Sequence, residues 1–149
     1  MKTSFEVSVI VSQNQSHAWE YYFNQINGWW SKDFHTSPST KRFTIDTYIG
    51  GYVYEDYGEG GGLIWGDVIG VKYNEWLLIR GNLSREFGGP AITMEKFAFE
   101  AYSKTETKVI YTCDFIGNIK ERSVQSLHDV WKEILHIHYK NYCQERKHD

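Results

Sequence analysis

Glu55 is the polar residue whose position has the most chemical meaning. It lies in the segment from Tyr52 to Tyr57, where residue types alternate as along a β-strand, so Val53, Glu55 and Tyr57 share one face. If that face points inward, the carboxylate must be paired with another group or its pKa rises. A buried carboxylate of this kind would indicate a functional site. If Tyr52 and Tyr54 point inward instead, Glu55 is solvated. The segment alone leaves both alternatives open.

The six histidines form no metal-binding pattern. His136 and His138 are two residues apart in a segment with helical spacing, so their side chains diverge by roughly 200°. The sequence has no HExxH motif and no pair of histidines four residues apart. His138 fits a core or pocket histidine better than a base, although Glu55 with His35 or His138 could form an acid–base pair. We therefore predict no metal site.

Motifs for a nucleophile or a bound phosphate are also absent from the sequence. There is no GxSxG motif, and the glycine-rich segment 58–62 lacks the Lys-Ser/Thr pair of a phosphate loop. Cys113 and Cys143 have no metal-type spacing, and free, reduced thiols are favoured over a disulfide between them. The sequence predicts no cofactor and assigns no catalytic residue.

Composition bounds the class of protein. The chain has 149 residues, 41% of them hydrophobic and 23% charged, which fits one folded domain over residues 1–149. Its net charge is −3, and no cluster of basic residues supports a nucleic-acid partner. No apolar run is long enough for a transmembrane helix, and the first residues do not resemble a signal peptide, so we predict a cytoplasmic protein without membrane insertion.

Hydrophobic periodicity divides the chain into strands and helices. A capping box at Ser12 and Gln15 predicts the start of a first helix, and a second short helix is expected over residues 26–34. The strands are predicted over residues 5–11, 43–47, 52–57, 63–71, 76–80, 92–102 and 108–116. Asn118 and Glu121 predict the start of a long last helix of six or seven turns.

The last helix has one apolar stripe, which consists of Val124, Leu127, Trp131, Leu135, His138 and Tyr142. An antiparallel sheet with one apolar face must be covered, and one long amphipathic helix can lie across it. The order of elements therefore predicts an α+β fold in which an antiparallel curved sheet wraps around the C-terminal helix. Such a geometry tends to enclose a cavity.

Several short motifs resemble those of a known superfamily. They are Ser16-His17-Ala18-Trp19, Trp29-Trp30, Gly50-Gly51 followed by Tyr52-Val53-Tyr54, Gly66-Asp67-Val68-Ile69 with Leu77-Leu78, and Trp131 with Ile134-Leu135. In this order the chain resembles the SRPBCC superfamily, also called the START or helix-grip fold. Within it, the chain looks most similar to the branch related to the activator of the heat-shock-protein-90 ATPase. The resemblance covers nearly the whole chain.

This resemblance implies a pocket between the sheet and the long helix that binds hydrophobic or amphipathic molecules. The family pattern also suggests that Val53 and Tyr57 point inward, and Glu55 with them. Charged neighbours at Lys96 and Glu100 should face solvent, which turns the alternate residues of that strand inward. The candidate ligand-binding residues are Trp30, Phe34, Val53, Glu55, Tyr57, Phe97, Phe99, Tyr111, Leu127, Trp131, Leu135 and His138. These aromatic residues either fill the interior or line a cavity.

The same alternation predicts aromatic residues on the outer face of the sheet. If Asp67 and Arg80 face solvent, so do four aromatic residues of neighbouring strands, namely Tyr52, Tyr54, Trp65 and Trp76. A contiguous exposed aromatic patch indicates an interface, which here would be a homodimer. In the alternative, the aliphatic stems of Lys and Arg side chains cover these rings.

Three functions are compatible with this pattern. The preferred one is binding of a small hydrophobic or amphipathic molecule in the cavity between sheet and helix. An alternative is an enzyme on the same scaffold that uses Glu55 or a histidine as acid or base. The other is a chaperone-associated interaction module. One scaffold in this superfamily serves carriers, enzymes and chaperone regulators, so the fold does not select among them.

Overall fold

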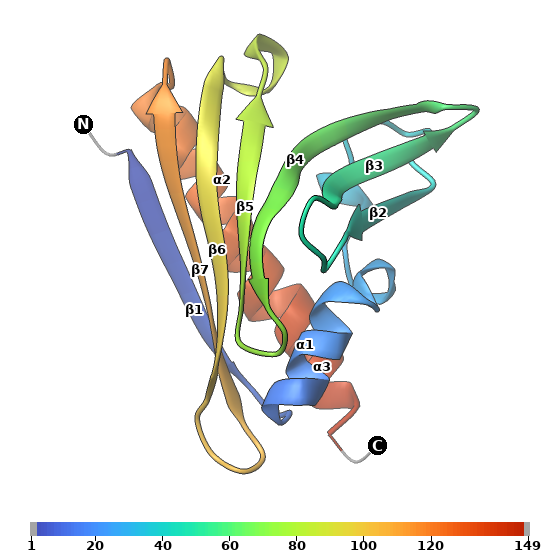
Figure 1. The fold of residues 1–149 in the computed structure, drawn as a ribbon, viewed down its shortest axis with the longest axis vertical. Coiled ribbons are helices and arrows are strands. Elements are labelled where there is room, and N and C mark those ends of the chain that lie inside the picture. Colours follow the sequence, from blue (N-terminus) through green and yellow to red (C-terminus); the bar gives the residue numbers. More distant parts are fainter. Residues whose placement is uncertain (1–2, 148–149) are drawn as a thin grey trace.

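The computed structural model describes residues 3–147 and has the predicted α+β helix-grip architecture (Figure 1). Seven antiparallel strands form one sheet in the order β1-β7-β6-β5-β4-β3-β2. The strands are β1 (Ser4–Val11), β2 (Arg42–Ile45), β3 (Tyr52–Gly58), β4 (Gly61–Lys72), β5 (Trp76–Leu83), β6 (Ala91–Ala101) and β7 (Thr107–Gly117). The helices are α1 (Gln15–Phe23), α2 (Glu121–Glu133) and α3 (Lys140–Glu145), and α2 and α3 are joined by a π-helical segment (Ile134–Tyr139).

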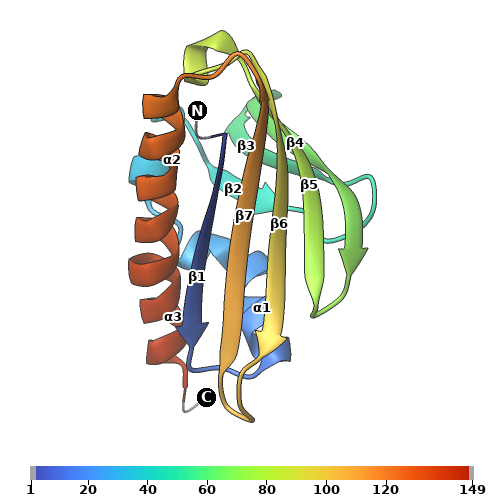
Figure 2. The same ribbon diagram turned by 90° about the vertical axis from the view of Figure 1, so that its left-hand side faces the viewer.

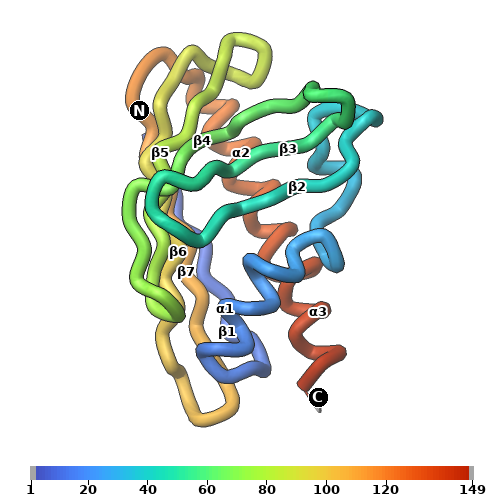
Figure 3. Tube along the Cα trace, turned by 45° about the vertical axis from the view of Figure 1, so that its right-hand side comes forward, coloured from blue at the N-terminus to red at the C-terminus, as the bar shows by residue number. Residues whose placement is uncertain are grey.

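The sheet curls around the continuous C-terminal helix formed by α2, the π-helical segment and α3. Seen from the side, this helix runs along the concave face of the sheet beside β1 and β7 (Figure 2). β2, β3 and β4 curve away from the other strands and pass above α1 (Figure 3). α1 packs against β6 and closes one end of the space between sheet and helix. No helix among residues 3–147 is both long and apolar enough to cross a membrane.

Strict alternation holds along the flat strands. In β1, Phe5, Val7, Val9 and Val11 are buried and their neighbours are not. β6 and β7 pair over their whole length without a register shift, so their inward residues stay inward from end to end. The side-chain directions predicted for these strands are therefore observed.

Alternation fails in β4 because the strand contains β-bulges. Val53 pairs with Gly66 while the next residue of β3, Tyr54, pairs with Ile64, so Trp65 is an extra residue without a partner. A bulge places two adjacent side chains on one side and reverses the alternation beyond it. The prediction that Trp65 faces outward with Asp67 is consequently wrong, and Ile64 takes the exposed position instead.

The helix starts differ from the predicted ones by a few residues. Asn14, not Ser12, caps α1, and its side chain accepts a hydrogen bond from the His17 backbone N–H. The long helix begins at Glu121 without a side-chain cap, although Asn118 suggests one. The expected second short helix consists of two 3₁₀ turns, Ile26–Gly28 and Lys32–Phe34.

The π-helical segment changes which residues of the C-terminal helix are buried. A π-helix has more residues per turn than an α-helix, so positions four residues apart stay on one face instead of drifting around it. The buried residues after Trp131 are therefore Ile134, Leu135, Tyr139 and Cys143, whereas His138 and Tyr142 are only half-buried. The Tyr139 hydroxyl donates a hydrogen bond of 2.7 Å to the Ala18 carbonyl and joins this helix to α1.

The aromatic residues divide between a filled end and an open end of the interior. At the α1 end, Trp19, Tyr22 and Phe23 pack edge-on or tilted against Phe97 and Phe99 and leave no space. Toward β2–β4 the facing rings are further apart and a cavity remains. The two predicted roles of the aromatic residues, filling and lining, are thus both present.

Candidate functional site

A cavity of about 310 Å³ lies between the curled sheet and α2. Its walls are mainly aromatic and aliphatic, and include Phe5, Phe43, Ile79, Phe115, Leu127 and Trp131. The Trp131 ring stacks on Tyr111 with 3.9 Å between ring centroids, which holds both rings in place. Residues of β2, β3 and β4, the strands that curve away from the rest of the sheet (Figure 3), form one wall of this cavity.

Seven of the twelve predicted ligand-binding residues line this cavity. They are Trp30, Phe34, Val53, Glu55, Tyr111, Leu127 and Trp131. Val53 and Glu55 are both buried, so the inward alternative for this segment is the observed one. Trp30 and Phe34 pack against each other at one end of the cavity, where the sequence places them.

The other five predicted residues lie outside the cavity lining. Phe97, Phe99 and Leu135 are buried in the packed core. Tyr57 hydrogen-bonds Thr36 with 2.5 Å between the hydroxyl oxygens. His138 is displaced by the π-helical segment and pairs with Glu133 through Nε2, at 3.0 Å from Oε2. None of these five residues is part of the cavity wall.

Glu55 is the centre of a saturated hydrogen-bond network, which we call the Glu55 cluster (Glu55, Thr36, Thr40 and Trp65). Oε1 accepts hydrogen bonds from the Thr36 N–H at 2.8 Å and the Thr40 hydroxyl at 2.9 Å. Oε2 accepts from the Thr36 hydroxyl at 3.0 Å and from Trp65 Nε1 at 2.8 Å. Each carboxylate oxygen therefore has two donors, which is its full capacity.

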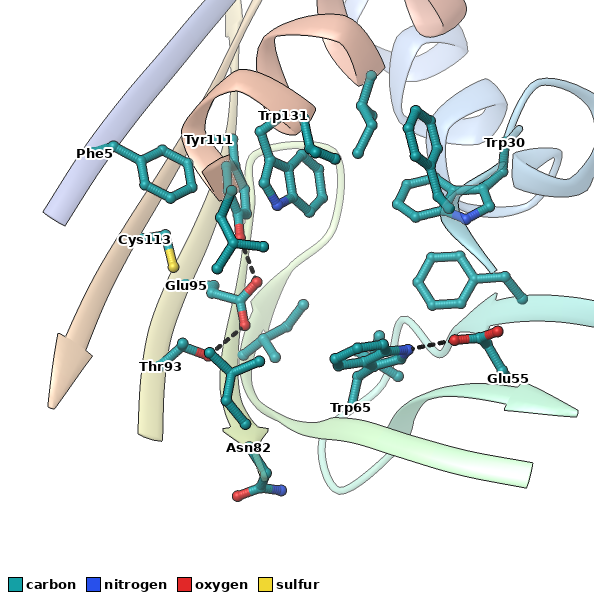
Figure 4. Close-up of a pocket in the computed structure, with 18 of the residues that line it drawn as sticks. Phe5, Trp30, Glu55, Trp65, Asn82, Thr93, Glu95, Tyr111, Cys113 and Trp131 are labelled. Carbon is teal, nitrogen blue, oxygen red and sulfur yellow. Dashed lines mark hydrogen bonds between the residues drawn. The ribbon is translucent and has the colours of Figure 1, made fainter. Parts of the chain in front are cut away.

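The Glu55 cluster has a structural consequence. It ties the segment 36–40 to β3 and fixes the Trp65 ring against the cavity (Figure 4). With all four acceptor positions occupied, the carboxylate cannot take a proton from a ligand without breaking a bond already made. The acid–base pair of Glu55 with His35 or His138 is not among the hydrogen bonds of the residues described.

Trp65 belongs to the cavity wall and not to an outer aromatic patch. The β4 bulge turns it inward, where its indole N–H meets Glu55. Tyr52 is 49% exposed, and Tyr54 and Trp76 are half-buried on the convex side. The homodimer through the outer face stays a prediction, with Trp65 removed from it.

A second carboxylate, missing from the predicted residues, lies on the opposite wall. Glu95 accepts a hydrogen bond from the Thr93 hydroxyl at 2.8 Å and another from the Tyr111 hydroxyl. Figure 4 shows this Glu95 cluster (Glu95, Thr93 and Tyr111) across the cavity from Trp65 and Glu55. Burial raises the pKa of Glu95, and the two hydrogen bonds offset part of that rise.

The backbone of β5 makes room for the Glu95 cluster. A Cβ atom on Gly81 would lie 2.1 Å from Thr93 Oγ1 and 2.5 Å from Glu95 Oε2. The absence of a side chain at Gly81 therefore lets both polar groups lie over β5. On β7, burial and the Glu95 carboxylate raise the pKa of the Cys113 thiol, which stays protonated and serves as apolar lining.

The sequence contained a signal for Glu95. Glu95 and Thr93 have the same parity along β6 as Phe97 and Phe99, whose inward direction follows from Lys96 and Glu100. A carboxylate on a strand face that is otherwise aromatic indicates a buried polar group. The argument that predicts an inward direction for the Phe97 side chain therefore predicts the same direction for Glu95.

Comparison with known proteins supports the fold. No protein-family model matches the chain, and no curated protein matches its sequence. A START superfamily protein from Mycobacterium smegmatis has a similar structure, with a TM-score of 0.66 at 13% identity over 97% of this chain and 99% of the other. Protein MLL2253 from Mesorhizobium loti gives 0.69 at 15% identity, over 96% and 97% of the two chains.

A third similar structure is DynU16, a protein of the dynemicin biosynthetic locus. It matches with a TM-score of 0.72 at 15% identity, over 97% of this chain and 48% of DynU16. This chain thus spans about half the length of DynU16. At such identities the similarity concerns the fold alone. The curled sheet, the long helix and these neighbours together show a START-like helix-grip fold.

Proposed function

We propose that this protein binds a small hydrophobic or amphipathic molecule in the cavity between the sheet and α2. The observation that carries the proposal is the cavity itself, about 310 Å³ of space with mainly apolar walls between the sheet and the helix. Ligand pockets typically begin at about this volume and combine apolar walls with a few polar groups. Proteins with a START-like fold commonly bind hydrophobic ligands.

The test is mass spectrometry of the organic extract of freshly purified protein. Ile79→Phe adds a ring inside the cavity, because Ile79 is buried and lines it. Ile92→Phe is the matched control, since Ile92 lies on the neighbouring strand and is 44% exposed on the convex side. The wild type and the control should release the same compound in stoichiometric amount, and Ile79→Phe should have lost most of it.

Two outcomes would contradict the proposal. One is a compound that remains in Ile79→Phe at the wild-type level, because it would be bound elsewhere. The other is an empty wild-type extract together with no calorimetric binding of 1-naphthalenemethanol, a small apolar probe. In that case the cavity does not bind apolar molecules.

An enzyme on the same scaffold is a second candidate, and Glu95 is the observation that favours it. A carboxyl group with a raised pKa that faces a cavity is suited to proton transfer. Conversion of the extracted compound by wild type but not by Glu95→Gln would support this candidate. The relation to the activator of the heat-shock-protein-90 ATPase rests on the sequence motifs, and the binding proposal does not depend on it.

A further inference from the structure

We propose that the Glu95 cluster selects ligands that carry a protonated nitrogen, so that the cavity takes an amphipathic amine, with the apolar body among the aromatic rings. This inference rests on the proposed function and specifies its ligand class. It is carried by three observations: the unused acceptor positions of Glu95, the charges around the cavity, and the rings beside the carboxylate.

The first observation is that the two carboxylates differ in how many of their acceptor positions are filled. A carboxylate offers about four acceptor positions. Glu55 has all four filled, whereas Glu95 has one donor on each oxygen, Tyr111 on Oε1 and Thr93 on Oε2. Two acceptor positions of Glu95 are thus left for a ligand. Its place in the cavity wall makes them accessible from that space (Figure 4).

The second observation is the sign of the charges. The ionisable residues that line the cavity include three carboxylates, Asp33, Glu55 and Glu95, and no Lys, Arg or His among residues 3–147. Burial and the Glu95 carboxylate raise the pKa of the Tyr22 and Tyr111 phenols and of the Cys113 thiol, and none of these three groups carries a positive charge. A carboxylate in an apolar wall without a cationic partner is unfavourable, and a cationic ligand would relieve that cost.

The third observation is the aromatic surface next to Glu95. Trp131 stacks on Tyr111, whose hydroxyl donates to Glu95, so a head group at the carboxylate lies close to two rings. Cations are attracted to the faces of Trp and Tyr rings. Acidic ligands such as fatty acids would instead face three like charges without a basic partner.

The experiment compares three probes that share one apolar body and differ in the head group. They are 1-naphthylmethylamine, 1-naphthalenemethanol and 1-naphthoic acid, each titrated calorimetrically at pH 7. A hydrogen bond to a charged group corresponds to a factor of about 10 to 100 in affinity. The amine should therefore bind at least about tenfold tighter than the alcohol, and the acid should bind most weakly.

Glu95→Gln should remove the advantage of the amine and leave the affinity for the alcohol nearly unchanged. Glu100→Gln is the matched control, because it removes the same charge from the exposed face of the same strand. Tyr111→Phe is a second variant, in which the carboxylate remains and loses one donor. It should keep the preference for the amine.

The outcomes separate this inference from the proposed function. Binding of the alcohol or the acid as tightly as the amine overturns the inference but leaves a hydrophobic binding site. An amine preference that persists in Glu95→Gln overturns it as well. Failure of all three probes to bind wild-type protein overturns the inference, and together with an empty extract it contradicts the proposed function as well.

Discussion

Glu55 and Glu95 lie on opposite walls of one cavity and differ in what surrounds them. Glu55 receives four hydrogen bonds from the segment 36–40 and from β4, so its network connects three parts of the chain. Glu95 receives two, one from Thr93 of its own strand and one from Tyr111 of the neighbouring β7, and borders open space. A carboxylate with all acceptors filled holds the structure together, whereas one with free acceptors can meet a ligand.

The comparison is tested most directly by the same substitution at both walls. In Glu55→Gln an amide NH₂ replaces one carboxylate oxygen. An NH₂ group cannot accept hydrogen bonds, so the N–H and O–H groups that donated to that oxygen lose their partner. We expect a loss of about 3 kcal/mol in the free energy of unfolding, since each orphaned polar group costs about 1–3 kcal/mol. Urea denaturation measures this change.

Glu95→Gln is the counterpart of that variant and should change the free energy of unfolding at pH 7 by less than about 1 kcal/mol. Its amide still has an oxygen for one donor, and the removed charge was buried without a cationic partner. Equal losses at both sites would show that the two carboxylates have the same role.

An effect between those of Glu55→Gln and Glu95→Gln is expected from Gly81→Ala, which fills the space under the Glu95 cluster. The new methyl group meets Thr93 Oγ1 and Glu95 Oε2, so both side chains must move. We expect destabilisation of about 2 kcal/mol, typical of overpacking in a close-packed interior. The measurement is again urea denaturation. Thr93→Ala, which removes the nearest atom, should recover part of this loss in the double variant, and strict additivity would argue against the contact.

The smallest effect is the contribution of Glu95 to the pH dependence of the free energy of unfolding. Burial raises the pKa of Glu95 in the folded state. As the pH rises, the unfolded chain therefore releases this proton first, and the folded state loses stability between the ordinary pKa of Glu and the raised one. Unfolding of wild type and Glu95→Gln between pH 4 and 7 should show wild type losing stability relative to the variant. A constant difference across this range would contradict it.

The flat strands were predictable because nothing interrupts their alternation. Lys96 and Glu100 together orient β6, and the buried Phe97 confirms that direction. That regularity also contains Glu95, which the prediction passed over although its parity matches Phe97. The saturation of Glu55 was not predictable, because Thr36 and Thr40 lie in an irregular segment whose path is set by tertiary contacts.

Two local irregularities account for the wrong side-chain directions. The π-helical segment places Tyr139 and Cys143 where an α-helical count expects His138 and Tyr142. The β4 bulge similarly moves Trp65 from the convex to the concave side. The π-helical segment adds a residue to a helical turn, and the bulge adds a residue to one strand of a pair. Residue types do not reveal either insertion, because large side chains that can be buried stand at both the expected and the observed positions.

The irregular course of β4 has a consequence for how this cavity could change over time. Besides Trp65, Ile69 is an extra residue, because Val68 pairs with Ile79 while Gly70 pairs with Leu78. Because such a residue has no partner on the neighbouring strand, the loss of one codon there would remove its side chain and leave the other residues of β4 with their partners and on their faces. Deletion of residue 65 would take the indole away from Glu55 without altering any neighbouring strand. A single-residue deletion, rather than a series of substitutions, is thus the shortest mutational route to a differently shaped ligand site on this scaffold.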